Sequence, residues 1–271
     1  MKNALIQVMD NVETLDYILT HKASVIRFGD GEFDIMAGRS IPYQSYNDEL
    51  SEQLKSIVQC ESNHSLLICL PDVFRDLERY NEFCLNFWKS HLEHNEALYS
   101  SLCTASKYGS AFLSRPYIDL KDKTSVQDYF TSLKKLWLDK DVLIVEGYLS
   151  RSGVGNDLFA GASSIKRIIC PSNNAFSKVE QIFDTIKKYA ENKLVLLMLG
   201  PTAKVLAYRL SQEGIWVVDL GHIDSEYEWY KMGATSKVKL SNKHTADFNY
   251  DQGIMLDFDE GYEASIVERI K

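Results

Sequence analysis

The 271-residue chain has no apolar run long enough to cross a membrane as a helix. Such a span needs roughly 20 apolar residues in succession, and no stretch approaches that length. The first residues also carry acidic side chains at Asp10, Glu13 and Asp16, where a secretion signal would be uninterrupted. We therefore expect no membrane span and no secretion signal.

Cysteine pairs of the kind that bind zinc are also lacking. The five cysteines are an odd number, and none belongs to a Cys-x-x-Cys pair. This pattern suggests neither a disulfide framework nor a zinc site. Free cysteines of this kind are typical of a reducing compartment, so a cytoplasmic location is expected.

Basic residues are outnumbered by acidic ones, which gives a formal net charge of −8. Binding to nucleic acid phosphates relies on a basic surface that releases counterions. We therefore expect no nucleic acid partner. A small anionic ligand is still compatible with this charge if arginines, helix N-termini or a metal ion surround it locally.

The chain shows no internal repeat, low-complexity linker or shift in composition. Hydrophobic residues make up 45% of it, which is enough for a sizeable core. We expect one domain over residues 1–271, in which an acidic segment from about 243 to 271 forms a C-terminal arm ending in a short helix-like stretch, EASIVERI.

Apolar runs alternate with helical patterns along most of the sequence. The clearest strands are 24–29, 65–71, 141–147, 165–170, 193–200 and 215–221, and the helical patterns are 4–19, 48–58, 76–99, 124–138, 177–191 and 202–213. Several strands are apolar on both faces, as central parallel strands covered by helices are. The alternation predicts a Rossmann-like, doubly wound α/β fold with a mostly parallel sheet.

In such a sheet, ligands bind beyond the carboxyl ends of the strands. The first strand is followed by Arg27, Asp30 and Glu32. If the strand continues to Glu32, its period of two puts both carboxylates on one side, where they could hold a divalent cation. Mg²⁺ or Mn²⁺ suits an oxygen-rich site. The alternative is an ordinary Asp-Gly turn and a solvated glutamate.

The fifth strand is followed by Gly200, Pro201 and Thr202. Glycine permits close approach of the backbone, and proline fits the first turn of a helix. The free N–H groups of that turn are a natural anion site. These three residues could equally do no more than begin the helix.

The third strand leads into a glycine-containing segment, residues 147–159. Gly153 and Gly155 resemble the beginning of a dinucleotide fingerprint, but the third glycine and the acidic residue after the next strand are missing. Arg151 and Asn156 could contact phosphate or sugar hydroxyls, because a bidentate arginine suits phosphate. A tight turn without a ligand is the alternative.

The sixth strand is followed by residues 221–230, with His222, Asp224, Glu226 and Glu228 at alternate positions. In a helix, His222 would share a face with Glu226, and Asp224 with Glu228. Either pair could supply a general base beside a ligand. Alternatively, Asp224 caps the helix while the glutamates interact with its dipole.

Arg115, just before a proline, is a further candidate for binding a diphosphate, although it could simply pair with an acid. All these candidates are predicted to lie at one edge of the sheet. Independent turns would have no reason to converge there.

The same segments carry a family resemblance that runs through nearly the whole chain. They are SVIRFGDGEF, YQSYNDEL, CLPDVF, SRPYID, VLIVEG with SRSGVGNDLF, IKRIICPSNNAF, LGPTAKVLAYRLS and DLGHIDSEYEWYKMGA. In this order they resemble the bacterial glycosyltransferases of the GT-D fold. That family was first catalogued as a domain of unknown function and is typified by a glucosyltransferase that extends glycans on a streptococcal adhesin.

The resemblance implies a metal-dependent hexosyltransferase that moves a sugar, most simply glucose, from a UDP-sugar to a carbohydrate acceptor on a glycoprotein or surface polysaccharide. The family's Asp-x-Glu signature falls on Asp30 and Glu32, which would place Mn²⁺ or Mg²⁺ against the donor's diphosphate. Developing charge on UDP would then be stabilised by the cation and arginines. We expect Glu228 to be the general base, supported by Glu226 and Asp224, and His222 to orient a group or bind phosphate.

Two other functions are compatible with the same residues. A nucleotide-sugar hydrolase would use the same cation and phosphate site with water as acceptor. A non-catalytic nucleotide-sugar-binding subunit would need no base. The amphipathic N-terminal helix could pack against a second copy of the chain, so a homo-oligomer stays open.

Overall fold

The computed structural model describes residues 6–245, 247–248, 251 and 253–271. Its centre is an eight-stranded sheet in the order β3-β2-β1-β7-β6-β4-β5-β8. Every pairing between these strands is parallel. The strands are β1 Ser24–Arg27, β2 Leu66–Leu70, β3 Gly109–Ser110, β4 Asp141–Gly147, β5 Ser164–Cys170, β6 Leu194–Met198, β7 Val217–Asp219 and β8 Ile266–Arg269.

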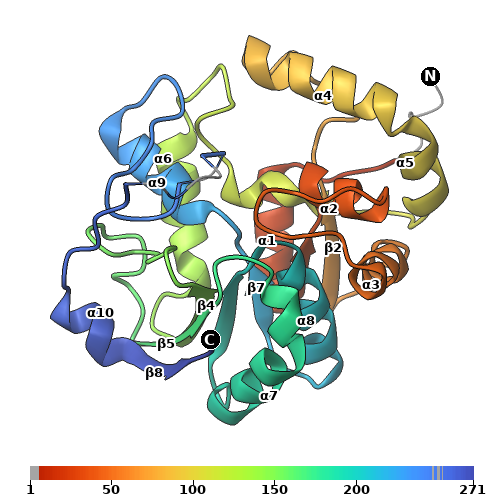
Figure 1. The fold of residues 1–271 in the computed structure, drawn as a ribbon. Helices are drawn as coiled ribbons and strands as arrows, with labels where there is room; N and C mark the ends of the chain where they lie inside the picture. Colours follow the sequence, from red (N-terminus) through yellow and green to blue (C-terminus); the bar gives the residue numbers. More distant parts are fainter. Residues whose placement is uncertain (1–5, 246, 249–250, 252) are drawn as a thin grey trace.

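Helices cover both faces of the sheet, as Figure 1 shows. The α-helices are α1 Asn11–His21, α2 Asp30–Met36, α3 Asp48–Val58, α4 Glu82–His94, α5 Glu96–Leu102, α6 Val126–Leu133, α7 Val179–Tyr189, α8 Gly200–Gln212, α9 Ile223–Met232 and α10 Glu260–Ser265, with short 3-10 helices η2 Ala111–Ser114, η3 Lys134–Leu136 and η4 Ala175–Lys178. The predicted doubly wound α/β fold with a parallel sheet is confirmed.

Two hydrophobic cores lie on the two faces. Helices α3, α7 and α8 pack on one face and α1, α6 and α9 on the other. Along β1, Ile26 belongs to the first core and Val25 to the second, and both are fully buried. Burial of such a side chain stabilises the fold by roughly 1.5–3 kcal/mol. Strands that are apolar on both faces are therefore covered by helices on both sides, as predicted.

The N-terminal helix begins later than predicted. Residues 1–5 lie outside the described part, and α1 begins at Asn11 rather than residue 4. A capping box sets this start: the Asp10 side chain accepts the Glu13 amide at 2.8 Å, and the Glu13 side chain accepts the Asp10 amide at 3.0 Å. The two acidic residues that argued against a secretion signal therefore begin a helix.

Other predicted elements differ as well. The helix expected over 76–99 is divided into α4 and α5 at Asn95, and α4 is capped by Asn81, which accepts the Cys84 amide. The helix-like ending EASIVERI divides into α10 and the strand β8. Its β-branched residues suit a strand, and β8 pairs with β5 and forms the edge of the sheet beside it. The first strand ends at Arg27, not residue 29.

Among the residues that the structure describes, no helix is both long and apolar enough to cross a membrane.

Candidate active site

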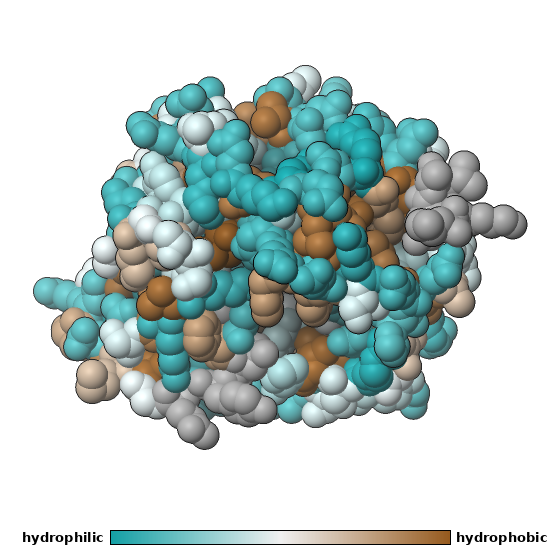
Figure 2. Space-filling model, turned by 90° about the horizontal axis from the view of Figure 1, so that it is seen from above, coloured by the Kyte–Doolittle hydropathy of each residue, from teal (hydrophilic) through white to brown (hydrophobic). Residues whose placement is uncertain are grey.

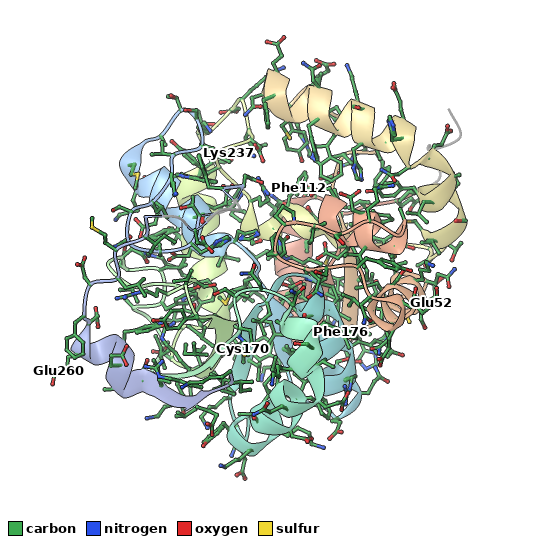
Figure 3. The ribbon with its side chains drawn as sticks, in the orientation of Figure 1. Glu52, Phe112, Cys170, Phe176, Lys237 and Glu260 are labelled. Atoms are coloured by element: carbon green, nitrogen blue, oxygen red, sulfur yellow. The ribbon has the colours of Figure 1, made fainter. Side chains whose placement is uncertain are left out.

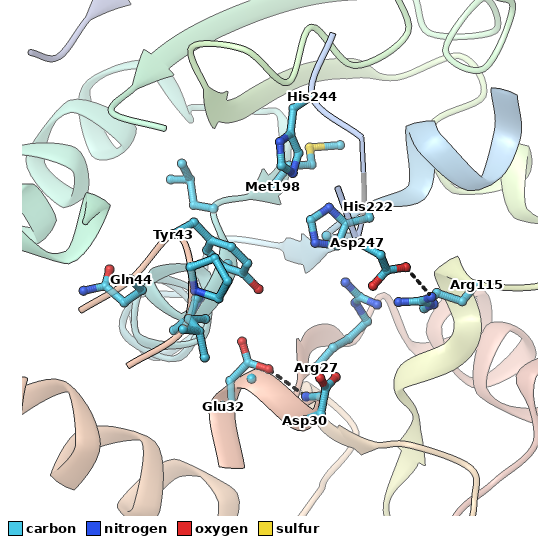
Figure 4. A pocket seen from close by; sticks show the side chains of 18 of the residues that line it. Arg27, Asp30, Glu32, Tyr43, Gln44, Arg115, Met198, His222, His244 and Asp247 are labelled. Carbon is cyan, nitrogen blue, oxygen red and sulfur yellow. Dashed lines mark hydrogen bonds and ion pairs between the residues drawn. The ribbon is translucent and has the colours of Figure 1, made fainter. Parts of the chain in front are cut away.

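A cavity of about 490 Å³ lies beyond the carboxyl ends of the central strands. Seven of the predicted site residues line it: Arg27, Asp30, Glu32, Arg115, Gly200, Pro201 and His222. Figure 4 shows side chains from β1, α2 and the segment after β7 around one space. The predicted convergence therefore holds for these seven candidates, whereas Arg151, Asn156, Thr202, Asp224, Glu226 and Glu228 lie outside the lining.

The cavity lies where the winding of the sheet changes sides. Strands β1 and β7 are neighbours. The chain leaves β1 toward α3 on one face, whereas it leaves β7 toward α9 on the other. Neighbouring strands whose connections diverge in this way leave a crevice at their carboxyl ends, and ligands of open α/β sheets bind there.

Arg27 connects three segments at the base of this crevice. Its Nε donates to the Asp219 carbonyl and its Nη1 to the Ala111 carbonyl, both at 2.8 Å. Gly221 makes room for it, because a Cβ there would lie 1.9 Å from Arg27 Nη2. Gly221 also has φ +50°, a conformation that glycine tolerates best.

Replacement of Gly221 by alanine should therefore destabilise the fold by roughly 1–3 kcal/mol and displace Arg27. Gly214→Ala is the matched control, because Gly214 has φ +76° but nothing lies within 4 Å of a Cβ there. The control should show the backbone strain alone. Urea unfolding measures both variants, and equal losses would contradict the steric role of Gly221.

Asp30 and Glu32 do not continue the first strand as predicted. Gly29 is the N-cap of α2, and both acids lie in its first turn. Glu32 Oε2 accepts the Gly29 amide at 2.7 Å, and Glu32 Oε1 forms an ion pair with Lys204 at 3.0 Å. The two carboxylates therefore have different surroundings, and the strand-based pairing was wrong.

Asp30 differs from the other acids of the cavity. Among the described residues that line it, every other acid pairs with a basic side chain: Glu32 with Lys204, Asp34 with Arg39, Asp119 and Asp247 with Arg115, and Asp251 with His244. Asp30 forms no ion pair in that set, and burial raises its pKa, although Arg115 opposes this. The Asp30 carboxylate can therefore bind a cation or accept a hydrogen bond from a ligand.

These residues fit a divalent cation only in part. Within the described ranges, no group of three or more His, Cys, Asp or Glu side chains could hold a metal. Asp30 fits as one oxygen ligand, whereas both oxygens of Glu32 already have partners. Mg²⁺ commonly takes one or two carboxylates and completes its shell with phosphates and water, so Asp30 is the side chain that fits this role.

Lys204 is a functional candidate that sequence reasoning missed. It lies in α8, is 4% exposed, and bridges Glu32 at 3.0 Å and Asp219 at 3.1 Å. Its Nζ also donates to the Gly200 carbonyl at 3.1 Å. The signal that could have revealed it is a lysine among the buried positions of an amphipathic helix.

The N-terminus of α8 also faces the cavity. Gly200 has φ +50°, and a Cβ there would lie 2.7 Å from Tyr43 Cε2, so glycine lets Tyr43 cover the helix end. Pro201 occupies the first turn as predicted. Thr202 is fully buried and lies outside the cavity lining.

Arg115 is surrounded by acids at the opposite wall. Its Nη2 lies 3.0 Å from Asp119 and 3.2 Å from Asp247, and its Nε lies 3.9 Å from Glu226. These acids raise the pKa of Arg115 against the effect of burial. A phosphate bound there would have to exchange with one of the carboxylates.

His222 precedes α9 and lines the cavity. Burial, and after it the neighbouring His244 ring, lower the pKa of His222 to about 3. The imidazole is therefore neutral near pH 7. It can donate or accept one hydrogen bond to a ligand, but it does not offer a positive charge to phosphate.

The three acids of α9 lie outside the cavity lining. The predicted shared face of Asp224 and Glu228 exists, but both carboxylates are occupied by Asn156 and the buried Lys243. Asp224 also accepts the Gly153 amide at 2.7 Å. These contacts hold the loop that contains Gly153 and Asn156 against α9. The position of Glu228 in this cluster therefore does not support it as the base.

Glu226 and Arg151 also have structural partners. Glu226 Oε2 accepts the amides of Tyr117 and Ile118, both at 3.1 Å, and burial raises its pKa to about 7. Arg151 donates to the Asp257 carbonyl and lies over the Tyr262 ring. Glu226 thus connects α9 to the 117–118 segment. Arg151 connects the loop after β4 to the C-terminal arm through Asp257 and Tyr262.

Comparison with known proteins agrees with this architecture. A family model described as "Glycosyltransferase GT-D fold" matches residues 25–248. A probable glycosyl transferase Gly from Streptococcus gordonii is 58% identical over 98% of this chain and 39% of its own length. Glycosyltransferase GlyD from Streptococcus pneumoniae serotype 4 is 55% identical over 98% of this chain and 33% of its own length. The chain thus spans well under half of these curated relatives.

Solved structures match over almost the whole chain. One, described as showing that the highly conserved domain of unknown function 1792 has a distinct glycosyltransferase fold, has a TM-score of 0.99 and 56% identity, covering 100% of this chain and 98% of the other. A new glycosyltransferase from Streptococcus sanguinis has a TM-score of 0.97 and 57% identity, covering 98% of this chain and all of the other. The chain belongs to the family of glycosyltransferases with the GT-D fold.

Proposed function

We propose that this chain transfers a sugar, glucose in the simplest case, from a UDP-sugar to a carbohydrate acceptor on a glycoprotein or surface polysaccharide. The observation that carries the proposal is the cavity at the β1–β7 crevice, where Asp30 is free of ion pairs among the described residues and the N-terminus of α8 is close by. Family membership supports the reaction class.

The diphosphate is the part of the donor that this cavity suits best. The N–H groups at the beginning of α8 and the guanidinium group of Arg27 supply positive potential, and Arg115 would add to it where a phosphate displaces one of its carboxylate partners. Asp30 would hold Mn²⁺ or Mg²⁺, which, when bound, neutralises charge on the departing diphosphate. Neutral His222 supplies one hydrogen bond, and Lys204 keeps Glu32 in place.

A donor panel tests this function directly. The protein is incubated with Mn²⁺, one UDP-sugar at a time and a mixture of oligosaccharides, and both released UDP and extended acceptor are measured. We expect UDP release coupled to acceptor extension, with UDP-glucose among the active donors. UDP release that is equally fast without acceptor would indicate the hydrolase, and tight UDP binding without turnover would indicate the binding subunit.

Chelation tests the metal separately. In excess EDTA, transfer should fall by roughly 10²-fold or more, because uncompensated charge develops on the leaving diphosphate. Added Mn²⁺ or Mg²⁺ should restore it. Full transfer in the chelator would exclude a cation from the proposal.

Glu228→Gln tests whether the originally expected base acts in the reaction. Because Glu228 lies outside the cavity lining and contacts Asn156 and Lys243, we expect kcat to stay within a few-fold of wild type. Stability is measured alongside by urea unfolding. A loss of kcat by roughly 10²-fold or more with unchanged stability and UDP affinity would restore Glu228 as the base.

A further inference from the structure

Helix α4 presents two exposed aromatic side chains to the cavity. Phe83 is 69% exposed and Phe87 is 40% exposed, and both belong to the cavity lining. Residues four apart on a helix lie on the same face. Exposed aromatic rings on the wall of a candidate active site are unlike scattered surface phenylalanines, because a ligand in the cavity can cover them.

Phe87 rests on a packed aromatic base. Phe87 contacts Trp88 at 5.4 Å and His91 at 5.8 Å between ring centroids. Trp88 is 5% exposed and packs on Phe112 at 5.8 Å. Figure 3 places Phe112 beneath α4. The Phe87 ring therefore has a defined position before any ligand arrives, which reduces the entropy lost on binding.

Polar groups lie beside these rings. Lys237 Nζ lies 5.2 Å from the centre of the Phe83 ring and 2.8 Å from Asp247. Asp119, 3.8 Å from the same Nζ, also lines the cavity. An apolar ring face with nearby charged hydrogen-bonding groups matches a pyranose, which has one apolar C–H face and hydroxyl groups around its edge.

The two rings come from a different element than the groups suited to the diphosphate. Those groups come from β1, α2, the end of η2, α8 and the segment after β7, whereas Phe83 and Phe87 come from α4. Seen from above, apolar side chains lie among hydrophilic ones on this face of the molecule (Figure 2). The greater exposure of Phe83 suits a ligand that extends out of the cavity, as a sugar at the end of a longer glycan does.

We propose that Phe83 and Phe87 form a subsite that binds the carbohydrate acceptor by stacking on its sugar rings. This rests on the proposed function, because it assigns the second substrate of the same cavity. Lys237 and Asp119 lie where they can contact the hydroxyl groups of the stacked sugar. The chemical class of ligand is a glycan of at least one pyranose unit, not a nucleobase.

The test uses binding measurements that do not depend on turnover. Cellobiose, maltose and N,N′-diacetylchitobiose are the probes, observed by saturation-transfer NMR with the full chain, and UDP affinity is measured by calorimetry. The variants are Phe83→Ala, Phe87→Ala and the double replacement. Phe258→Ala is the matched control, because Phe258 is 84% exposed and lies outside the cavity lining.

We expect at least one disaccharide to bind the wild type and the Phe258 control equally. The double variant should bind it roughly 10-fold or more weakly, with unchanged UDP affinity and unchanged unfolding in urea. Equal binding by the double variant, or no binding of any probe by wild type saturated with UDP, would overturn the subsite. A loss confined to UDP affinity would overturn it in favour of a nucleobase site.

The same measurements separate this inference from the proposed function. The wild type could bind a disaccharide but not UDP, while the double variant binds neither. In that case the aromatic subsite stands and the UDP-sugar transferase does not.

Discussion

Asp30→Asn is expected to reduce sugar transfer by roughly 10²-fold or more while leaving the fold intact. Asp30 is the one acid of the described cavity lining without an ion pair, so its replacement leaves no buried cation unpaired. The loss should therefore appear in kcat and in the Mn²⁺ dependence of UDP binding, with the free energy of unfolding changed by less than about 1 kcal/mol.

Asp16→Asn is the matched control, because Asp16 is an exposed acid of α1 outside the cavity. It should keep both transfer and stability. Wild-type turnover by Asp30→Asn in the presence of Mn²⁺ would remove Asp30 from the reaction.

Lys204→Met is expected to cost roughly 3–5 kcal/mol of the free energy of unfolding, because it leaves Glu32 with a buried, unpaired charge and removes a partner of Asp219. Urea unfolding measures the loss. Adding Glu32→Gln should recover part of it, since the unpaired carboxylate is then neutral.

Lys187→Met is the surface control for this variant. Lys187 pairs with Glu213 at 2.6 Å, but both side chains are more than 40% exposed. Removal of such a pair should cost no more than about 1 kcal/mol. If Lys204→Met were as stable as this control, the buried bridge between α8, α2 and β7 would have no structural role.

The doubly wound, parallel class of the sheet and its six inner strands followed from sequence, because these strands are short apolar runs between helices with clear periodicity. The edge strands β3 and β8 were not predicted. The end of a strand is a local backbone property, however, and Gly29 turns the chain into α2 two residues after Arg27. The apolar run could not show this. Asp30 and Glu32 were therefore found as candidates, but their shared side was predicted wrongly.

The partners of buried charges were harder to predict than their location. Glu228 is held by Asn156 and Lys243, which lie 72 and 15 residues away in the chain. Lys204 meets Glu32 only because α8 packs beside α2 at the end of the sheet. Pairings of this kind depend on tertiary contacts, and no helical period or motif spacing reports them.

The most direct test of the account is a crystal structure with UDP and Mn²⁺, in which diffraction data at the manganese absorption edge locate the metal. The account predicts a manganese peak between the Asp30 carboxylate and the UDP diphosphate, with the phosphates facing the beginning of α8. A diphosphate bound away from the β1–β7 crevice, with no metal or water joining it to Asp30, would contradict it.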